Sequence, residues 1–209
     1  MFNCRGPENR VRLLEKYNVK PISHTKLLKG QVKRSCAKEM LTDEYYIFTY
    51  HAKNNINESG TFVCGTHVAR HFLELLHLEP LPLFNPLKGN NENVDLNDNL
   101  NGNSGGGNIV WDPLAKELYN AINLLIVCWD KALYGTLLRI KEELERYPTS
   151  TPFEWKVESI NSVISRDYRK RKLIQMIEEL KKDNENLKTY TFEHVTEVLN
   201  KKGIESYFV

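Results

Sequence analysis

An asparagine- and glycine-rich stretch, residues 88–108, divides the chain and limits what can fold on either side of it. It reads KGNNENVDLNDNLNGNSGGGN and holds almost no large apolar side chains. Such a segment cannot bury enough apolar surface to offset the entropy lost when a chain is ordered. The sequence therefore predicts an N-terminal region over residues 1–87, a flexible linker over residues 88–108 and a C-terminal region over residues 109–209.

The clearest strand patterns lie in the N-terminal region. Residues 44–52, EYYIFTYHA, are rich in aromatic and β-branched side chains, and TFVC at 61–64 is similar. The turn-rich KNNINESG lies between them, so the two stretches predict an antiparallel hairpin. Helices are expected over residues 9–17 and from Thr66, as N-cap, to about residue 78. Residues 19–40 have a mixed pattern that favours no element.

After residue 108 the pattern is helical. Asp112 as N-cap and Pro113 at the first helical position are a strong start signal. Apolar residues then recur at helical spacing to Trp129, and the pattern continues through Gly135, with a bend there, toward Tyr147.

Further helices are expected from Thr151, over residues 165–183 and from Thr191, and the tail, residues 204–209, is expected to return to the N-terminal sheet as a short strand. The predicted fold class is α+β, a small antiparallel sheet with flanking helices followed by a helical bundle. Because neither half is rich in apolar residues, we expect the C-terminal region to pack on the first.

Composition and hydropathy are typical of globular proteins, with 41% hydrophobic and 27% charged residues. The longest apolar run, INLLIVCW at 122–129, is shorter than the roughly 20 residues that cross a bilayer. The first ten residues lack the apolar core of a secretion signal. We therefore expect a cytoplasmic protein that does not enter a membrane, as a monomer or a homo-oligomer. In a reducing compartment its four cysteines are expected to be free thiols: Cys4, Cys36, Cys64 and Cys128.

Charge is unevenly distributed along the chain. Residues 1–40 hold ten Lys and Arg against three Asp and Glu, whereas residues 41–107 hold three against eight. Residues 108–209 hold sixteen of each kind. The basic N-terminal segment fits an acidic partner such as nucleic acid, and it equally fits the acidic middle of the same chain.

A second basic cluster, SRDYRKRK at residues 165–172, is predicted at a helix start. A basic helix with an aromatic side chain is a suitable phosphate-binding surface, so these residues are candidates for nucleic-acid binding. The alternative is an ordinary charged helix face, because acidic residues follow closely. The candidate contacts are Arg166, Arg169, Lys170, Arg171 and Lys172, with Tyr168 among them.

The stretch CGTHVAR places Cys64 and Arg70 at C-x5-R spacing between a predicted strand and a predicted helix. Backbone N–H groups and the helix dipole would hold an anion there and lower the thiol pKa. These seven residues resemble the signature loop of cysteine-dependent phosphatases, which implies Cys64 as nucleophile and Arg70 as phosphate ligand. That family has His, Gly and Ser or Thr where this chain has Val63, His67 and His71. The alternative is a small buried cysteine at a strand end.

The helix after Cys64 also carries a candidate metal site. His67 and His71 are four residues apart and Glu74 follows one turn later, so the three share one helix face. Two such histidines with a third ligand can bind zinc. Val68 occupies the position of the metalloprotease glutamate, and a solvated polar face is the alternative.

No complete catalytic set is present, so the leading hypothesis is a non-enzymatic binding or regulatory protein. It would act on nucleic acid or on a protein partner through basic helical surfaces, and reversing the charges of Arg169 and Arg171 would then weaken nucleic-acid binding. The alternative hypothesis is a cysteine- or metal-dependent hydrolase or phosphoryl-transfer enzyme centred on the Cys64–Arg70 loop.

Overall fold

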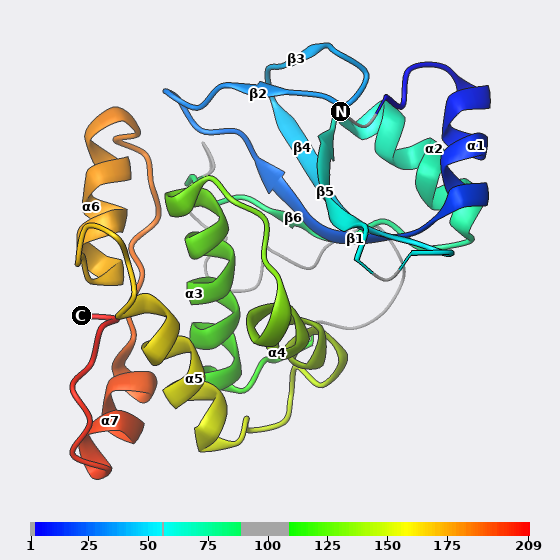
Figure 1. Ribbon diagram of the computed structural model, residues 1–209. Helices are drawn as coiled ribbons and strands as arrows, with labels where there is room; N and C mark the ends of the chain where they lie inside the picture. Colours follow the sequence, from blue (N-terminus) through cyan, green and yellow to red (C-terminus); the bar gives the residue numbers. More distant parts are fainter. Residues whose placement is uncertain (1–2, 56, 89–108) are drawn as a thin grey trace. The chain divides into compact units, whose positions relative to one another are not determined.

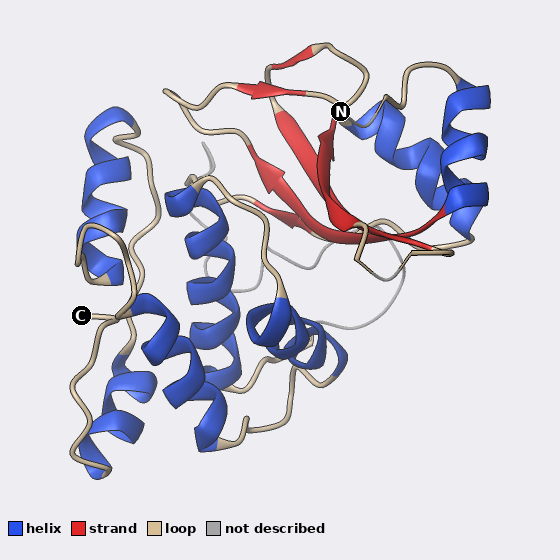
Figure 2. Ribbon diagram, viewed as in Figure 1, coloured by secondary structure: helices blue, strands red, loops and turns tan. Residues whose placement is uncertain are grey.

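The computed structural model describes residues 3–55, 57–88 and 109–209 (Figure 1). The described residues form two compact units, residues 3–85 in the first and residues 86–88 with 109–209 in the second. The first contains a four-stranded and a two-stranded sheet with two helices, and the second contains a bundle of helices (Figure 2). This confirms the predicted α+β class. The predicted linker lies outside the described residues apart from Lys88, and a core shared by the two units stays a prediction.

The main sheet of the first unit has the strand order β5-β4-β1-β6. Strands β1 (Tyr17–Lys26), β4 (Glu44–Ala52) and β5 (Ser59–Cys64) are antiparallel, while β6 (Leu83–Phe84) lies parallel to β1. The predicted hairpin is therefore confirmed, with β5 beginning two residues earlier. A separate pair is formed by β2 (Lys33–Arg34) and β3 (Met40–Leu41).

Strand β1 was not predicted because Pro21 interrupts an otherwise polar stretch. Proline cannot donate a ladder hydrogen bond and is tolerated in sheets at edges and bulges. Here the register with β4 shifts between Pro21 and Ser23, which accommodates the ring while β1 keeps its place between β4 and β6.

Helices α1 (Pro7–Lys16) and α2 (Thr66–Leu76) belong to the same unit and pack with the sheet (Figure 1). Phe72 of α2 lies 5.6 Å from Phe48 and 5.4 Å from Phe62, measured between ring centroids, in the core against the strands. The predicted cap is wrong by one residue, because Gly65 is the N-cap and Thr66 already starts the helix.

The expectation that all four cysteines are free thiols is wrong. Cys4 and Cys36 form a disulfide, with 5.5 Å between their Cα atoms, whereas Cys64 and Cys128 are free. Backbone hydrogen bonds bring the pair together: Cys4 N donates to Cys36 O, and Cys36 N donates to the carbonyl of Val63 on β5. These contacts are long-range, so local sequence carries no sign of them.

The second unit is organised around α3 (Pro113–Trp129), whose residues are buried on nearly every side. It is contacted by α4 (Gly135–Arg146), α5 (Glu154–Ile164), α6 (Leu173–Asp183) and α7 (Glu193–Lys201). The predicted start is confirmed, because Asp112 Oδ1 accepts a hydrogen bond from Ala115 N at 3.0 Å. A left-handed residue, Asp130 with φ of 55°, ends α3, so the predicted continuation through Gly135 is a separate helix.

Three further expectations about the second unit are wrong. Thr151 does not cap α5, because its hydroxyl donates to Asp112 Oδ2 and the helix begins at Glu154. Helix α7 begins at Glu193 rather than beside Thr191. The tail forms no strand, since the carbonyls of Tyr207 and Phe208 accept hydrogen bonds from the first residues of α6. None of the described helices has the length and apolar character needed to span a membrane.

Candidate functional site

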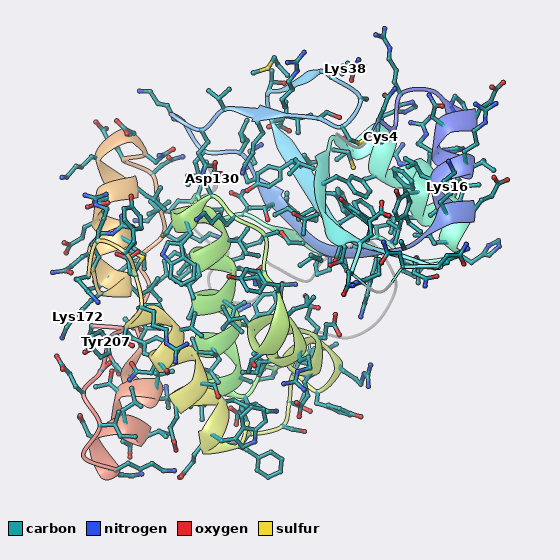
Figure 3. All side chains as sticks on the ribbon, in the orientation of Figure 1. Cys4, Lys16, Lys38, Asp130, Lys172 and Tyr207 are labelled. Atoms are coloured by element: carbon teal, nitrogen blue, oxygen red, sulfur yellow. A yellow bond between two sulfur atoms is a disulfide. The ribbon has the colours of Figure 1, made fainter. Side chains whose placement is uncertain are left out.

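The basic cluster at residues 165–172 lies in the connection between α5 and α6, not at a helix start. Helix α6 begins only at Leu173, and Lys170 has a left-handed backbone with φ of 58°. Lys172 and Tyr207 are labelled near one another in Figure 3, in keeping with the hydrogen bond from Leu173 N to Tyr207 O. We call residues 165–172 the basic turn.

Asp167 lies at the centre of the basic turn and is only 2% exposed. Its carboxylate accepts hydrogen bonds from Trp129 Nε1 at 2.9 Å and from the backbone N–H groups of Arg169 at 3.0 Å and Arg171 at 3.1 Å. The Arg171 side chain adds two more, from Nε and from its terminal nitrogen, each at 3.0 Å. One buried carboxylate therefore fixes both the backbone of the turn and its attachment to α3.

The electrostatics of Asp167 follow from these contacts. Burial alone would raise its pKa, but the hydrogen bonds from Arg171 and Trp129 favour the charged form and hold the pKa well below its ordinary value. The same hydrogen bonds from Arg171 to Asp167 raise the pKa of the guanidinium, with Glu179 adding to the effect. At neutral pH the turn is thus built on an ionised pair.

Glu179 on α6 accepts hydrogen bonds from the guanidinium groups of Arg169 and Arg171. Arg169 donates to both of its carboxylate oxygens, at 3.0 and 2.9 Å, and Arg171 donates to Oε2 at 2.6 Å. Arg169 and Arg171, two of the five predicted nucleic-acid contacts, are therefore hydrogen-bonded to carboxylates within the protein. Charge reversal at Arg169 and Arg171 would break these ion pairs and disturb the turn itself. A loss of nucleic-acid binding in that variant would therefore not show that the two arginines contact the ligand.

Four residues of the basic turn are exposed: Arg166, Tyr168, Arg169 and Lys170. Tyr168 is 83% exposed, and its ring lies 5.8 Å from the Arg171 guanidinium. Arg166 and Lys170 on either side are also exposed, and neither has an ion-pair partner among the described residues. Lys172 lies 4.0 Å from Glu205. The turn therefore presents the Tyr168 ring together with the cations of Arg166 and Lys170, while the exposed Arg169 is paired with Glu179.

The Cys64–Arg70 stretch is arranged differently from an anion-binding loop. Cys64 ends β5, Gly65 follows, and Thr66 already begins α2, so Arg70 lies on a helix rather than across a loop. Cys64 is fully buried, and burial raises its pKa despite the opposing charge of Arg10. Burial of Cys64 and its raised pKa disfavour a thiolate, and the hydrolase hypothesis stays a prediction.

Sequence reasoning missed the residues that lie beside Cys64 in the sheet. Tyr46 on β4 is the cross-strand partner of both Cys64 and His24, and the rings of His24 and Tyr46 stack with 4.0 Å between centroids. His24 Nε2 lies 3.4 Å from Glu44. Burial raises the pKa of Tyr46 to about 12, with a further contribution from Glu44. The alternating pattern of residues 44–52 is a signal that could have placed Tyr46 on a strand. The position of His24 could not be predicted in the same way, because it depends on β1, which the sequence did not predict.

The predicted zinc ligands lie on α2, where His67 and Glu74 are exposed and His71 is partly buried. His71 Nδ1 is buried without a hydrogen-bond partner. Within residues 3–55, 57–88 and 109–209, no three His, Cys, Asp or Glu side chains form a group that could hold a metal ion. Zinc binding by these residues stays a prediction, which elemental analysis of the purified protein can check.

Comparison with known proteins gives a family. No curated protein and no solved structure matches the chain significantly. The model of a family described as "Uncharacterised conserved protein UCP028583" matches residues 2–207, nearly the full length, and the chain belongs to that family.

Proposed function

We propose that this protein binds single-stranded nucleic acid, without catalysis, through the basic turn. The observation that carries the proposal is the exposed Tyr168 ring between the unpaired cations of Arg166 and Lys170. An aromatic ring beside cationic side chains is the usual platform for single strands, because each base can stack and each phosphate can pair with a cation. A protein partner is the alternative ligand of the same surface.

The rigidity of the turn supports a binding role. Asp167, Arg171 and Glu179 hold the backbone in place before any ligand arrives. A surface that is ordered in advance loses less conformational entropy on binding than a flexible one. An exposed tyrosine on such a base contributes nothing evident to the core, whereas it is well placed to stack on a base.

The test is fluorescence anisotropy with labelled oligodeoxythymidine of about 20 nucleotides at several salt concentrations. Tyr168→Ala is expected to weaken binding by about 1–3 kcal/mol, the usual contribution of one stacked base. The double variant Arg166→Gln, Lys170→Gln should reduce the slope of log affinity against log salt by about 1.4, since each lost phosphate contact removes about 0.7.

The matched control replaces two exposed lysines at the end of α6, Lys181→Gln with Lys182→Gln, which removes the same charge but leaves residues 165–172 unchanged. Its affinity should stay near that of the wild type. Equal losses in the control and in the Arg166, Lys170 variant would mean that only net charge matters, and the proposal would be wrong. The same oligonucleotide as a duplex should bind less tightly, because its bases are not available for stacking.

The proposal includes a cytoplasmic location, where nucleic acid is accessible. The Cys4–Cys36 disulfide is unusual for a reducing compartment. Alkylation of thiols in intact cells before lysis tests this part, because a cytoplasmic protein should yield the pair in its reduced form.

A further inference from the structure

Arg10, in α1 of the first unit, is a buried cation without an ion-pair partner among the residues that the structure describes. It is 6% exposed, and its Nε is fully buried with no hydrogen-bond partner. Among the described residues, no Asp or Glu forms an ion pair with its guanidinium. Buried arginines are normally paired, because an uncompensated charge in the interior is costly.

The Cys64 thiol is a group near Arg10 that could carry a negative charge if it were ionised. The charge of Arg10 acts on the Cys64 thiol at the end of β5, so the two groups lie near each other. That thiol is neutral at physiological pH, because burial raises its pKa more than Arg10 lowers it. Cys64 therefore cannot serve as the counter-ion, and no other described residue forms an ion pair with Arg10.

We infer that Arg10 is the anchor of a binding site for a phosphate group in the first unit. A guanidinium binds oxyanions with two parallel hydrogen bonds, and no described carboxylate forms an ion pair with the guanidinium of Arg10. The surrounding segment favours a multiply charged anion over a carboxylate, since residues 1–40 carry a net formal charge of +7 from ten basic and three acidic residues. This site is independent of the basic turn, which belongs to the second unit.

The experiment compares the thermal unfolding of the full-length protein in inorganic phosphate and in sodium chloride at equal ionic strength. Phosphate at about ten times its dissociation constant is expected to raise the unfolding midpoint by about 3 °C. A second arm with phenyl phosphate asks whether the ligand is free phosphate or a phosphate monoester. A larger shift with phenyl phosphate assigns the site to monoesters, and a larger shift with inorganic phosphate assigns it to the free ion.

Two substitutions on α1 decide whether Arg10 is responsible. Arg10→Met should abolish the phosphate shift and leave the midpoint in chloride unchanged or higher, since an unpaired buried charge is replaced by an apolar side chain. Arg12→Gln, an exposed arginine on the same helix, should keep the full shift. The inference is overturned if the wild type responds equally to phosphate and chloride, or if Arg10→Met and Arg12→Gln respond alike.

A third variant keeps the test decisive if Arg10→Met does not fold. Arg10→Lys retains the charge but loses the two-pronged geometry of the guanidinium, so its phosphate shift should be smaller than that of the wild type. An unchanged shift in Arg10→Lys would show that Arg10 does not bind phosphate through its guanidinium and would overturn the inference.

Discussion

Glu117 in α3 and His194 at the start of α7 lie in direct contact, with 2.7 Å between Oε1 and Nδ1. The same carboxylate accepts the backbone N–H groups of His194 at 3.2 Å and Val195 at 2.9 Å. It therefore satisfies the free N–H groups of the first turn of α7, as an N-cap side chain would, although it comes from a helix far away in the sequence.

We expect Glu117→Gln to lower the free energy of unfolding by about 1–2 kcal/mol, because a charged acceptor at a helix start is replaced by a neutral one. The hydrogen bond that the His194 ring donates to Glu117 raises the pKa of His194 above its ordinary value. The stabilisation from a raised histidine pKa is complete below the unfolded value of about 6.5 and is lost as pH rises through the folded value. Urea unfolding should thus show a larger effect of Glu117→Gln below that range than above it.

His194→Asn provides the control for this pH dependence. In that background the effect of Glu117→Gln on the free energy of unfolding should no longer depend on the pH range in which His194 titrates. The contribution from the hydrogen bond of the Val195 N–H remains. A pH-independent effect of Glu117→Gln in the wild-type background would contradict the role given to His194.

Asp167→Asn is expected to destabilise the second unit by about 2–3 kcal/mol near neutral pH, because it leaves Arg171 partly buried beside a neutral amide. The pKa of Asp167 is depressed in the folded protein, so its stabilisation is present above the unfolded value of about 3.9. It is lost as pH falls through the folded value. Chemical unfolding at a series of pH values should show the difference from wild type narrowing only in strong acid.

Glu178→Gln is the matched control for Asp167→Asn. Glu178 is an exposed carboxylate next to Glu179 on α6. Its replacement should change stability by less than about 0.5 kcal/mol, as is usual for surface positions. Comparable losses in the two variants would show that Asp167 has no special structural role.

The four cysteines should differ in their reactivity toward an alkylating reagent. When the protein is denatured without reductant and alkylated, mass spectrometry should detect two modified cysteines, Cys64 and Cys128. When the denatured protein is first reduced, all four cysteines should be modified. In the native protein Cys64 should be protected, because it is fully buried and burial raises its pKa. Rapid labelling of native Cys64 would contradict the buried position and would support the prediction that the thiol acts as a nucleophile.

Much of the fold could be predicted where signals are local. The aromatic and β-branched run at 44–52 predicts β4 because strand preference and alternation involve neighbouring residues only. Asp112 and Pro113 predict the start of α3 for the same reason, since a cap acts within three residues. The basic turn was recognised from its composition, although it was assigned to a helix start.

The sequence by itself therefore determined the α+β class, the hairpin of β4 and β5 and the segment in which the charged candidate site lies. Tertiary structure alone decided the placement of β1, the pairing of Cys4 with Cys36 and which side chains of the basic turn face solvent. The physical reason is that these features depend on contacts between residues far apart in the sequence. A buried carboxylate such as Asp167 accepts hydrogen bonds from whichever donors the fold places beside it. Trp129 and Arg171 meet there only after α3, α5 and α6 have packed together.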